Sequence, residues 1–139
     1  MAVGLHIRTG QIALRDGDRA FRLDIPELDL PAGQAVALTG ASGSGKTLVL
    51  ELLGLLRAPD AGTDYTLRHE NGGTTDLGAL WAAGPRSVEL AHTRGRVFGF
   101  VPQTGGLMPF LSVAENIALP QRITEKPDLA WCAALLDRL

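Results

Sequence analysis

An eight-residue stretch, residues 40–47, combines the residue types that bind phosphate groups. It reads Gly-Ala-Ser-Gly-Ser-Gly-Lys-Thr and satisfies the pattern G-x-x-x-x-G-K-[ST]. Its glycines let the backbone turn several N–H groups toward one point, where they solvate phosphate oxygens without side chains in the way. Lys46 can then reach the β- and γ-phosphates, and the hydroxyl of Thr47 can bind Mg²⁺. This phosphate loop therefore predicts a site for a nucleoside triphosphate.

A phosphate loop works between a strand and a helix, and the flanking sequence predicts both. Residues 34–39, Gln-Ala-Val-Ala-Leu-Thr, form a short apolar run typical of a central parallel strand that is buried on both faces. Residues 47–57 are rich in leucine and precede a Pro-Asp-Ala-Gly stop signal at 59–62, which predicts a mostly buried helix. The positive end of this helix would face the phosphates.

Several other segments indicate β-structure. Apolar and polar residues alternate in residues 5–7 and 21–25, which predicts half-buried strands, and Asp-Gly-Asp at 16–18 predicts a turn between them. Residues 63–94 are rich in glycine, threonine and turn signals, which predicts a small irregular β region. Residues 96–101 have the β-branched and aromatic content of a strand that stops at a proline.

The C-terminal third of the sequence indicates helices. Ser112 and Glu115 match the capping-box pattern, so a short helix is predicted to run to about Leu119. Pro127 then opens a last helix with one apolar face. That face comprises Leu129, Cys132, Leu135, Leu136 and Leu139.

Composition limits the classes of function. The chain has 139 residues, 45% of them hydrophobic, which is typical of one globular domain. A formal charge of −2 supplies no basic field, so no nucleic-acid partner is expected. Cys132 is the only cysteine, which excludes an internal disulfide and favours a buried packing role. His6, His69 and His92 lack ligand spacing, so no metal is expected other than Mg²⁺ with the nucleotide.

Two groups of segments resemble the ATP-binding cassette family. Residues 39–48 and 52–55, with the turn at 59–62, are similar to the family's phosphate loop, the helix that follows it and its closing turn. Phe-Gly-Phe-Val-Pro-Gln at 98–103, followed by residues 106–120, resembles the family's Q-loop and the start of its helical subdomain. The amino-acid sequence of residues 107–120 is most similar to the subgroup that serves lipoprotein release and macrolide-type export.

The resemblance implies an α/β fold of the P-loop NTPase class. It also implies an N-terminal antiparallel β subdomain, the start of a helical subdomain and an incomplete central sheet. The chain would form one partial cassette domain over residues 1–139. Its expected parts are the start of the β subdomain at 1–33, the P-loop core at 34–62, a β region with the Q-loop strand at 63–101, and the start of the helical subdomain at 102–139.

The family's ligand roles carry over to matching positions, with ATP and Mg²⁺ as the implied ligands. Lys46 and Gln103 would be catalytic, and Thr47 and Gln103 would contact the metal. The nucleotide would be held by Gly40, Ala41, Ser42, Gly43, Ser44, Gly45, Lys46, Thr47 and Leu48. Candidates for stacking on adenine are Phe21 and the turn at 15–18, although Phe21 alternates with other apolar residues, which favours a core-facing position.

Three family motifs do not occur in these 139 residues: the Leu-Ser-Gly-Gly-Gln signature, an Asp-Glu pair ending a hydrophobic strand, and a switch histidine. We therefore expect an N-terminal fragment, a truncated product or half of a split protein. Because phosphoryl transfer needs a positioned water and neutralised charge, the chain alone should bind nucleotide weakly and turn over negligibly. The strand expected beside residues 36–39 is also missing, which would leave an apolar edge uncovered.

The implied function is ATP binding and, in the complete protein, ATP hydrolysis that drives transport across a membrane. The expected partners are a transmembrane subunit and a second ATP-binding subunit. The start of the chain has no signal-peptide layout, and no apolar run approaches a membrane span, so a cytoplasmic place on the inner face of the cell membrane is expected. A small-molecule kinase, a cassette protein of DNA repair or translation, and a non-catalytic nucleotide-binding fragment remain as alternatives.

Overall fold

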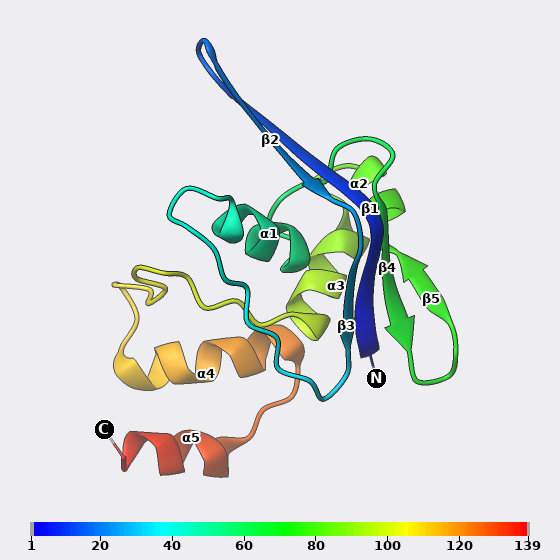
Figure 1. Ribbon diagram of the computed structural model, residues 1–139. Coiled ribbons are helices and arrows are strands. Elements are labelled where there is room, and N and C mark those ends of the chain that lie inside the picture. The colour runs from blue at the N-terminus through cyan, green and yellow to red at the C-terminus, as the bar shows by residue number, and fades with distance from the viewer. Residues whose placement is uncertain (1, 139) are drawn as a thin grey trace. The chain divides into compact units, whose positions relative to one another are not determined.

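The computed structural model describes residues 2–138, which form two compact units divided between Arg94 and Gly95. The first unit contains a five-stranded antiparallel sheet (Figure 1). Its strands are β1 (Ala2–Asp16), β2 (Arg19–Ile25), β3 (Leu28–Pro31), β4 (Asp64–His69) and β5 (Thr74–Asp76). The long strand β1 organises the sheet, because its first part pairs with β3 and β4 whereas its second part pairs with β2.

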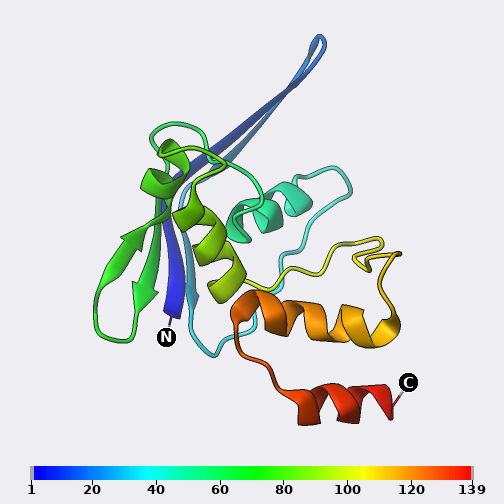
Figure 2. The ribbon, with the colours of Figure 1, turned by 180° about the vertical axis from the view of Figure 1, so that it is seen from behind.

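Helices cover one face of this sheet (Figure 2). They are α1 (Lys46–Leu53), α2 (Leu77–Ala82) and α3 (Val88–Val97), the last of which begins in the first unit. The core of the unit consists of apolar side chains from strands and helices, all at most 8% exposed. They are Ile7, Ile12, Ile25, Val49, Leu52, Leu55, Tyr65, Leu67, Leu77, Leu80 and Leu90.

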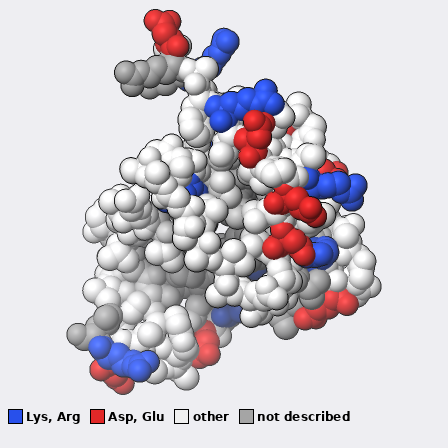
Figure 3. Space-filling model, in the orientation of Figure 1, with Lys and Arg blue, Asp and Glu red and all other residues white. Residues whose placement is uncertain are grey.

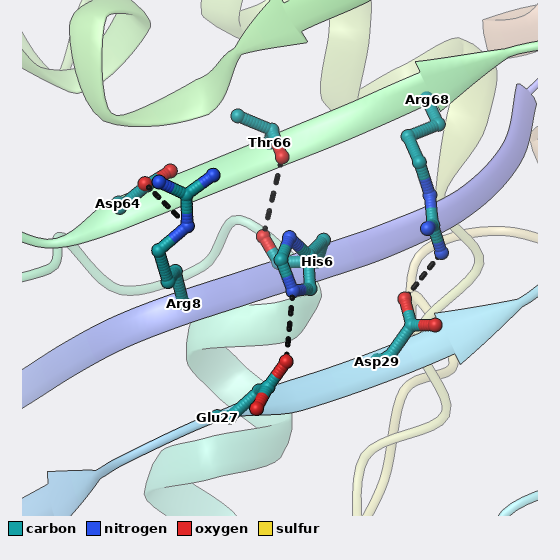
Figure 4. Close-up of polar contacts among 7 residues, drawn as sticks. All are labelled: His6, Arg8, Glu27, Asp29, Asp64, Thr66 and Arg68. Atoms are coloured by element: carbon teal, nitrogen blue, oxygen red, sulfur yellow. Dashed lines mark hydrogen bonds and ion pairs between the residues drawn. The ribbon is translucent and has the colours of Figure 1, made fainter.

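The opposite face of the sheet carries polar side chains, because successive residues of a strand point to opposite sides (Figure 4). Two contacts join β1 to a neighbouring segment, His6 with Glu27 and Arg8 with Asp64, and a third, Arg68 with Asp29, links β4 to β3 across β1. On the face drawn in Figure 3, positive and negative side chains lie next to one another along the right-hand side of the first unit. Exposed pairs of this kind contribute little to stability but keep this face polar.

The second unit contains α4 (Val113–Thr124) and α5 (Leu129–Leu136), as the sequence predicts. Ser112 and Glu115 form the complete capping box, and the Asp128 carboxylate accepts a hydrogen bond from the Trp131 N–H at the start of α5. Cys132 is buried, as predicted. The predicted end of this helix near Leu119 is wrong, because α4 continues through Pro120 to Thr124.

Two predicted strands are not formed: the one before the phosphate loop, at residues 34–39, and the one before Gln103, at residues 96–101. Residues 34–39 have no regular secondary structure, and Val36 and Leu38 are 58% and 42% exposed. Residues 96–101 begin as the last turn of α3 and continue without regular structure. A strand needs a hydrogen-bonding neighbour, and the described residues place none beside either segment. Both strand predictions are therefore wrong for this chain.

Two further predictions also need correction, one of a helix end and one of an irregular β region. Helix α1 ends at Leu53 rather than near residue 57, and it buries only Val49 and Leu52 while Leu50 is 49% exposed. The region 63–94, predicted to be irregular β-structure, contains α2 and α3 after its two strands. Asp76 and Ser87 accept hydrogen bonds from the N–H groups three residues ahead, and these local caps start the helices. The predicted α/β class, with an N-terminal antiparallel sheet and helices, is confirmed.

Candidate phosphate-binding site

The phosphate loop is a solvent-exposed turn that leads directly into α1. Gly43 and Gly45 have φ values of 77° and 93°, a region that only glycine adopts without strain. Gly45 is the N-cap of α1, and since it has no side chain, no side chain caps the first N–H groups of the helix. These donors stay available to an anion, which the positive end of the helix also favours.

Lys46 directs its ammonium group back over the loop. Its Nζ donates hydrogen bonds to the carbonyl oxygens of Gly40, at 2.9 Å, and Ala41, at 2.7 Å. The ammonium group has three protons, so one donor remains for a ligand. The positive charge and the helix N-terminus are thus brought together at one loop, as the sequence predicts for a phosphate site.

The remaining loop residues are accessible. Ala41, Ser42, Ser44 and Thr47 are exposed, whereas Leu48 is half-buried on α1. Within the part of the chain that the structure describes, no group of three His, Cys, Asp or Glu side chains could hold a metal ion.

Helix α1 is anchored at its C-terminal end, away from the phosphate loop. The hydroxyl of Tyr65 donates a hydrogen bond of 2.9 Å to the Leu53 carbonyl, and the Arg94 Nε donates one of 2.7 Å to the Leu55 carbonyl. Burial raises the pKa of Tyr65, so its hydroxyl remains a donor at neutral pH. These anchors satisfy carbonyls that a helix end leaves unpaired. Sequence reasoning missed both residues, because their partners lie far away in the chain.

Gln103 lies in the second unit, exposed in the segment between α3 and α4. The end of that segment is tied to α4 by Asn116. The Asn116 Oδ1 accepts a hydrogen bond of 2.8 Å from the Met108 N–H, and its Nδ2 donates to the Met108 and Leu111 carbonyls at 3.1 Å. Asn116 therefore shapes the segment after Gln103, a role that its place one residue after the capping box did not reveal.

The comparison with protein families agrees with this loop and with the α/β fold. A family model described as ABC transporter matches residues 23–139, which is most of the chain. The chain belongs to this family of ATP-binding cassette proteins.

Curated relatives carry names from the predicted subgroup. The lipoprotein-releasing system ATP-binding protein LolD of Nitrobacter winogradskyi is 41% identical over 73% of this chain and 39% of its own length. The pyoverdine export ATP-binding/permease protein PvdT of Pseudomonas savastanoi pv. phaseolicola is 40% identical over 81% of this chain and 16% of its own. The macrolide export ATP-binding/permease protein MacB of Burkholderia thailandensis is 39% identical over 70% of this chain and 13% of its own length.

These matches confirm the predicted family and subgroup. The alternative of a small-molecule kinase is not favoured. The chain spans less than half the length of these curated relatives. No solved structure matches the fold significantly. Among the described residues, none of the helices is both long enough and apolar enough to cross a membrane.

Proposed function

We propose that this chain binds ATP with Mg²⁺ through the phosphate loop, as the nucleotide-binding part of an ABC transporter. The observation that carries the proposal is the Lys46 ammonium, held over the loop by two carbonyls beside the uncapped start of α1. In this proposal the loop N–H groups and Lys46 bind the β- and γ-phosphates. The contacting residues are Gly40, Ala41, Ser42, Gly43, Ser44, Gly45, Lys46, Thr47 and Leu48.

The residues present also fit a magnesium ion. Mg²⁺ prefers oxygen ligands and binds few protein groups in nucleotide sites, so one hydroxyl and one amide oxygen suit it. We propose that Thr47, exposed at the start of α1, and Gln103, exposed in its own segment, supply these oxygens. When bound, the ion neutralises charge on the phosphates.

For the complete protein, we propose ATP hydrolysis that drives transport across a membrane. Support comes from relatives named as ATP-binding proteins of a lipoprotein-releasing system and as export ATP-binding/permease proteins. A transmembrane subunit or domain and a second ATP-binding subunit would be its partners, at the inner face of the cell membrane. Residues 34–62 would serve as the P-loop core and residues 102–139 as the start of the helical subdomain.

We also propose that the 139 residues alone do not hydrolyse ATP measurably. Lys46 and Gln103 are the catalytic candidates present, whereas the signature segment and the acidic pair that positions water in the family do not occur in this sequence. Without a positioned nucleophile, the loop is expected to bind nucleotide without turnover.

The test is titration of the purified chain with a fluorescent ATP analogue and Mg²⁺, with phosphate release followed in parallel. Lys46→Ala removes a charge-assisted contact of roughly 1.5–3 kcal/mol and should weaken binding about 10- to 100-fold. Lys126→Ala is the matched control, because it removes the only other lysine, which is exposed near the end of α4. Equal binding by the wild type and Lys46→Ala would contradict the proposal.

A further inference from the structure

Strand β2 lies against the end of the phosphate loop. Gly45 is half-buried, and a Cβ atom placed on it would lie 3.2 Å from the Phe21 Cζ and 3.2 Å from the Leu23 Cδ2. Contacts of this length are tighter than ordinary van der Waals distances, so the side chains of β2 already occupy the space beside the glycine. The residue before Lys46 therefore rests on an aromatic ring and a leucine from a strand more than twenty residues earlier.

We propose that Phe21 and Leu23 are positioning residues for the phosphate loop: they hold Gly45 and thereby orient Lys46 and the first N–H groups of α1 toward phosphate. This inference rests on the proposed ATP site and assigns to β2 a part in building it. Gly45 has a positive φ of 93° and no side chain of its own to fix it. A backbone with that freedom needs an external support to keep its donors converged.

Strand β2 can provide this support because it is itself held by antiparallel pairing with β1. Leu23 pairs with Ile12 of β1, which is 2% exposed, and Phe21 pairs with Leu14 in the same ladder. Ile25, on the same face of β2, is 8% exposed. The apolar face of β2 thus runs from the core of the first unit outward to the loop.

The geometry favours an action on the phosphates rather than on the adenine base. The atoms of Phe21 nearest to Gly45 are Cζ and Cε1, at 3.2 and 3.5 Å from the position of an added Cβ, so an edge of the ring touches the loop. Contact with the loop backbone affects any ligand that uses the loop, whereas stacking on adenine would affect only ligands that carry the base. This difference separates the two roles.

The experiment compares binding of Mg-ATP and of magnesium tripolyphosphate by the wild type, Phe21→Ala and Phe21→Leu. We expect Phe21→Ala to weaken both ligands by a similar factor, roughly tenfold. Phe21→Leu keeps an apolar side chain on β2 and should restore most of the affinity. Arg22→Ala is the matched control, because Arg22 is the next residue of β2 and is exposed on its other face.

A second measurement needs no ligand. Hydrogen exchange at the two hydrogen-bonded amides of this region should accelerate in Phe21→Ala and stay unchanged in Arg22→Ala. These are the Ser44 N–H, which donates to the Ala41 carbonyl, and the Val49 N–H, which donates to the Gly45 carbonyl. The combination of Gly45→Ala with Phe21→Ala should be less damaging than the sum of the single changes, because removal of the ring leaves room for the new methyl group.

Two results would overturn the inference. One is weaker ATP binding by Phe21→Ala with unchanged tripolyphosphate binding, which would indicate a base contact. The other is unchanged exchange of the Ser44 and Val49 amides in a folded Phe21→Ala variant. If the wild type binds in a Lys46-dependent way while these variants behave normally, only this inference fails. If Lys46→Ala binds ATP as tightly as the wild type, the proposed function is contradicted instead. The exchange measurement then still decides the role of Phe21.

Discussion

Lys46 stabilises the phosphate loop in the absence of a bound anion. The two carbonyls that accept from Lys46 belong to the same loop that presents N–H donors, so lysine and loop satisfy each other. A triphosphate would offer the ammonium stronger, charged acceptors. The role of Lys46 could be predicted from sequence, but its carbonyl partners could not, because carbonyl directions depend on the backbone angles of the glycines.

Tyr65 yields a prediction on pH dependence. Its side chain is fully buried and its pKa is raised by that burial, whereas an unfolded tyrosine ionises near pH 10. The stability that depends on neutral Tyr65 is present below about pH 10 and is lost as the pH rises above it, because only the unfolded state then releases the proton readily. Tyr65→Phe does not titrate, so its stability should fall less steeply at alkaline pH.

Urea unfolding at a series of pH values measures this difference, and the absorbance of tyrosinate provides a direct check, since Tyr65 is the only tyrosine of the chain. At neutral pH, Tyr65→Phe should lose about 1 kcal/mol, because the Leu53 carbonyl loses its donor. If the free energy of unfolding falls equally steeply with alkaline pH in the wild type and in Tyr65→Phe, the hydroxyl of Tyr65 is not buried in solution.

At the scale of secondary-structure elements, α4 begins with a capping box whose two residues, Ser112 and Glu115, are close in the sequence. The Glu115 carboxylate accepts from both the hydroxyl and the N–H of Ser112, and the Glu115 N–H donates back to the Ser112 hydroxyl at 3.3 Å. The hydrogen bond from the Ser112 side chain is the main cause that lowers the pKa of Glu115. Because every partner lies within four residues, this helix start could be predicted from sequence.

Ser112→Ala should therefore destabilise α4 by about 1 kcal/mol at neutral pH, measured as faster hydrogen exchange of the α4 amides. A lowered carboxyl pKa stabilises the fold above the unfolded value of about 4.3, and the effect is lost as the pH falls through the folded value. The difference between the wild type and Ser112→Ala should then shrink at acidic pH. Thr104→Ala, at an exposed position before α4, is the control and should leave the exchange unchanged.

On the scale of the whole chain, apolar surface remains uncovered in the first unit. Val36, Leu38, Leu50 and Leu56 are between 42% and 58% exposed. Residues 34–39 add unpaired backbone to this surface, and such a segment is a template for pairing with another chain.

We expect the purified chain to associate with increasing concentration, which sedimentation velocity can measure. Val36→Lys should reduce this association, because a charge on an unpaired segment opposes edge-to-edge pairing. Val88→Lys is the matched control, since Val88 is 73% exposed but lies in α3 and not in an extended segment that could pair with another strand. A wild-type chain that stays monomeric at all concentrations would refute this expectation.

The sequence by itself determined the phosphate loop, the family and the helices α4 and α5, because spacing, glycine content and capping patterns are local signals. Tertiary structure decided the state of residues 34–39 and 96–101, since a strand forms only where another strand offers hydrogen bonds. It also decided that Phe21 rests against Gly45 and that Tyr65 closes the end of α1. Those contacts join residues more than ten positions apart, and only the packing of the sheet against its helices brings them together.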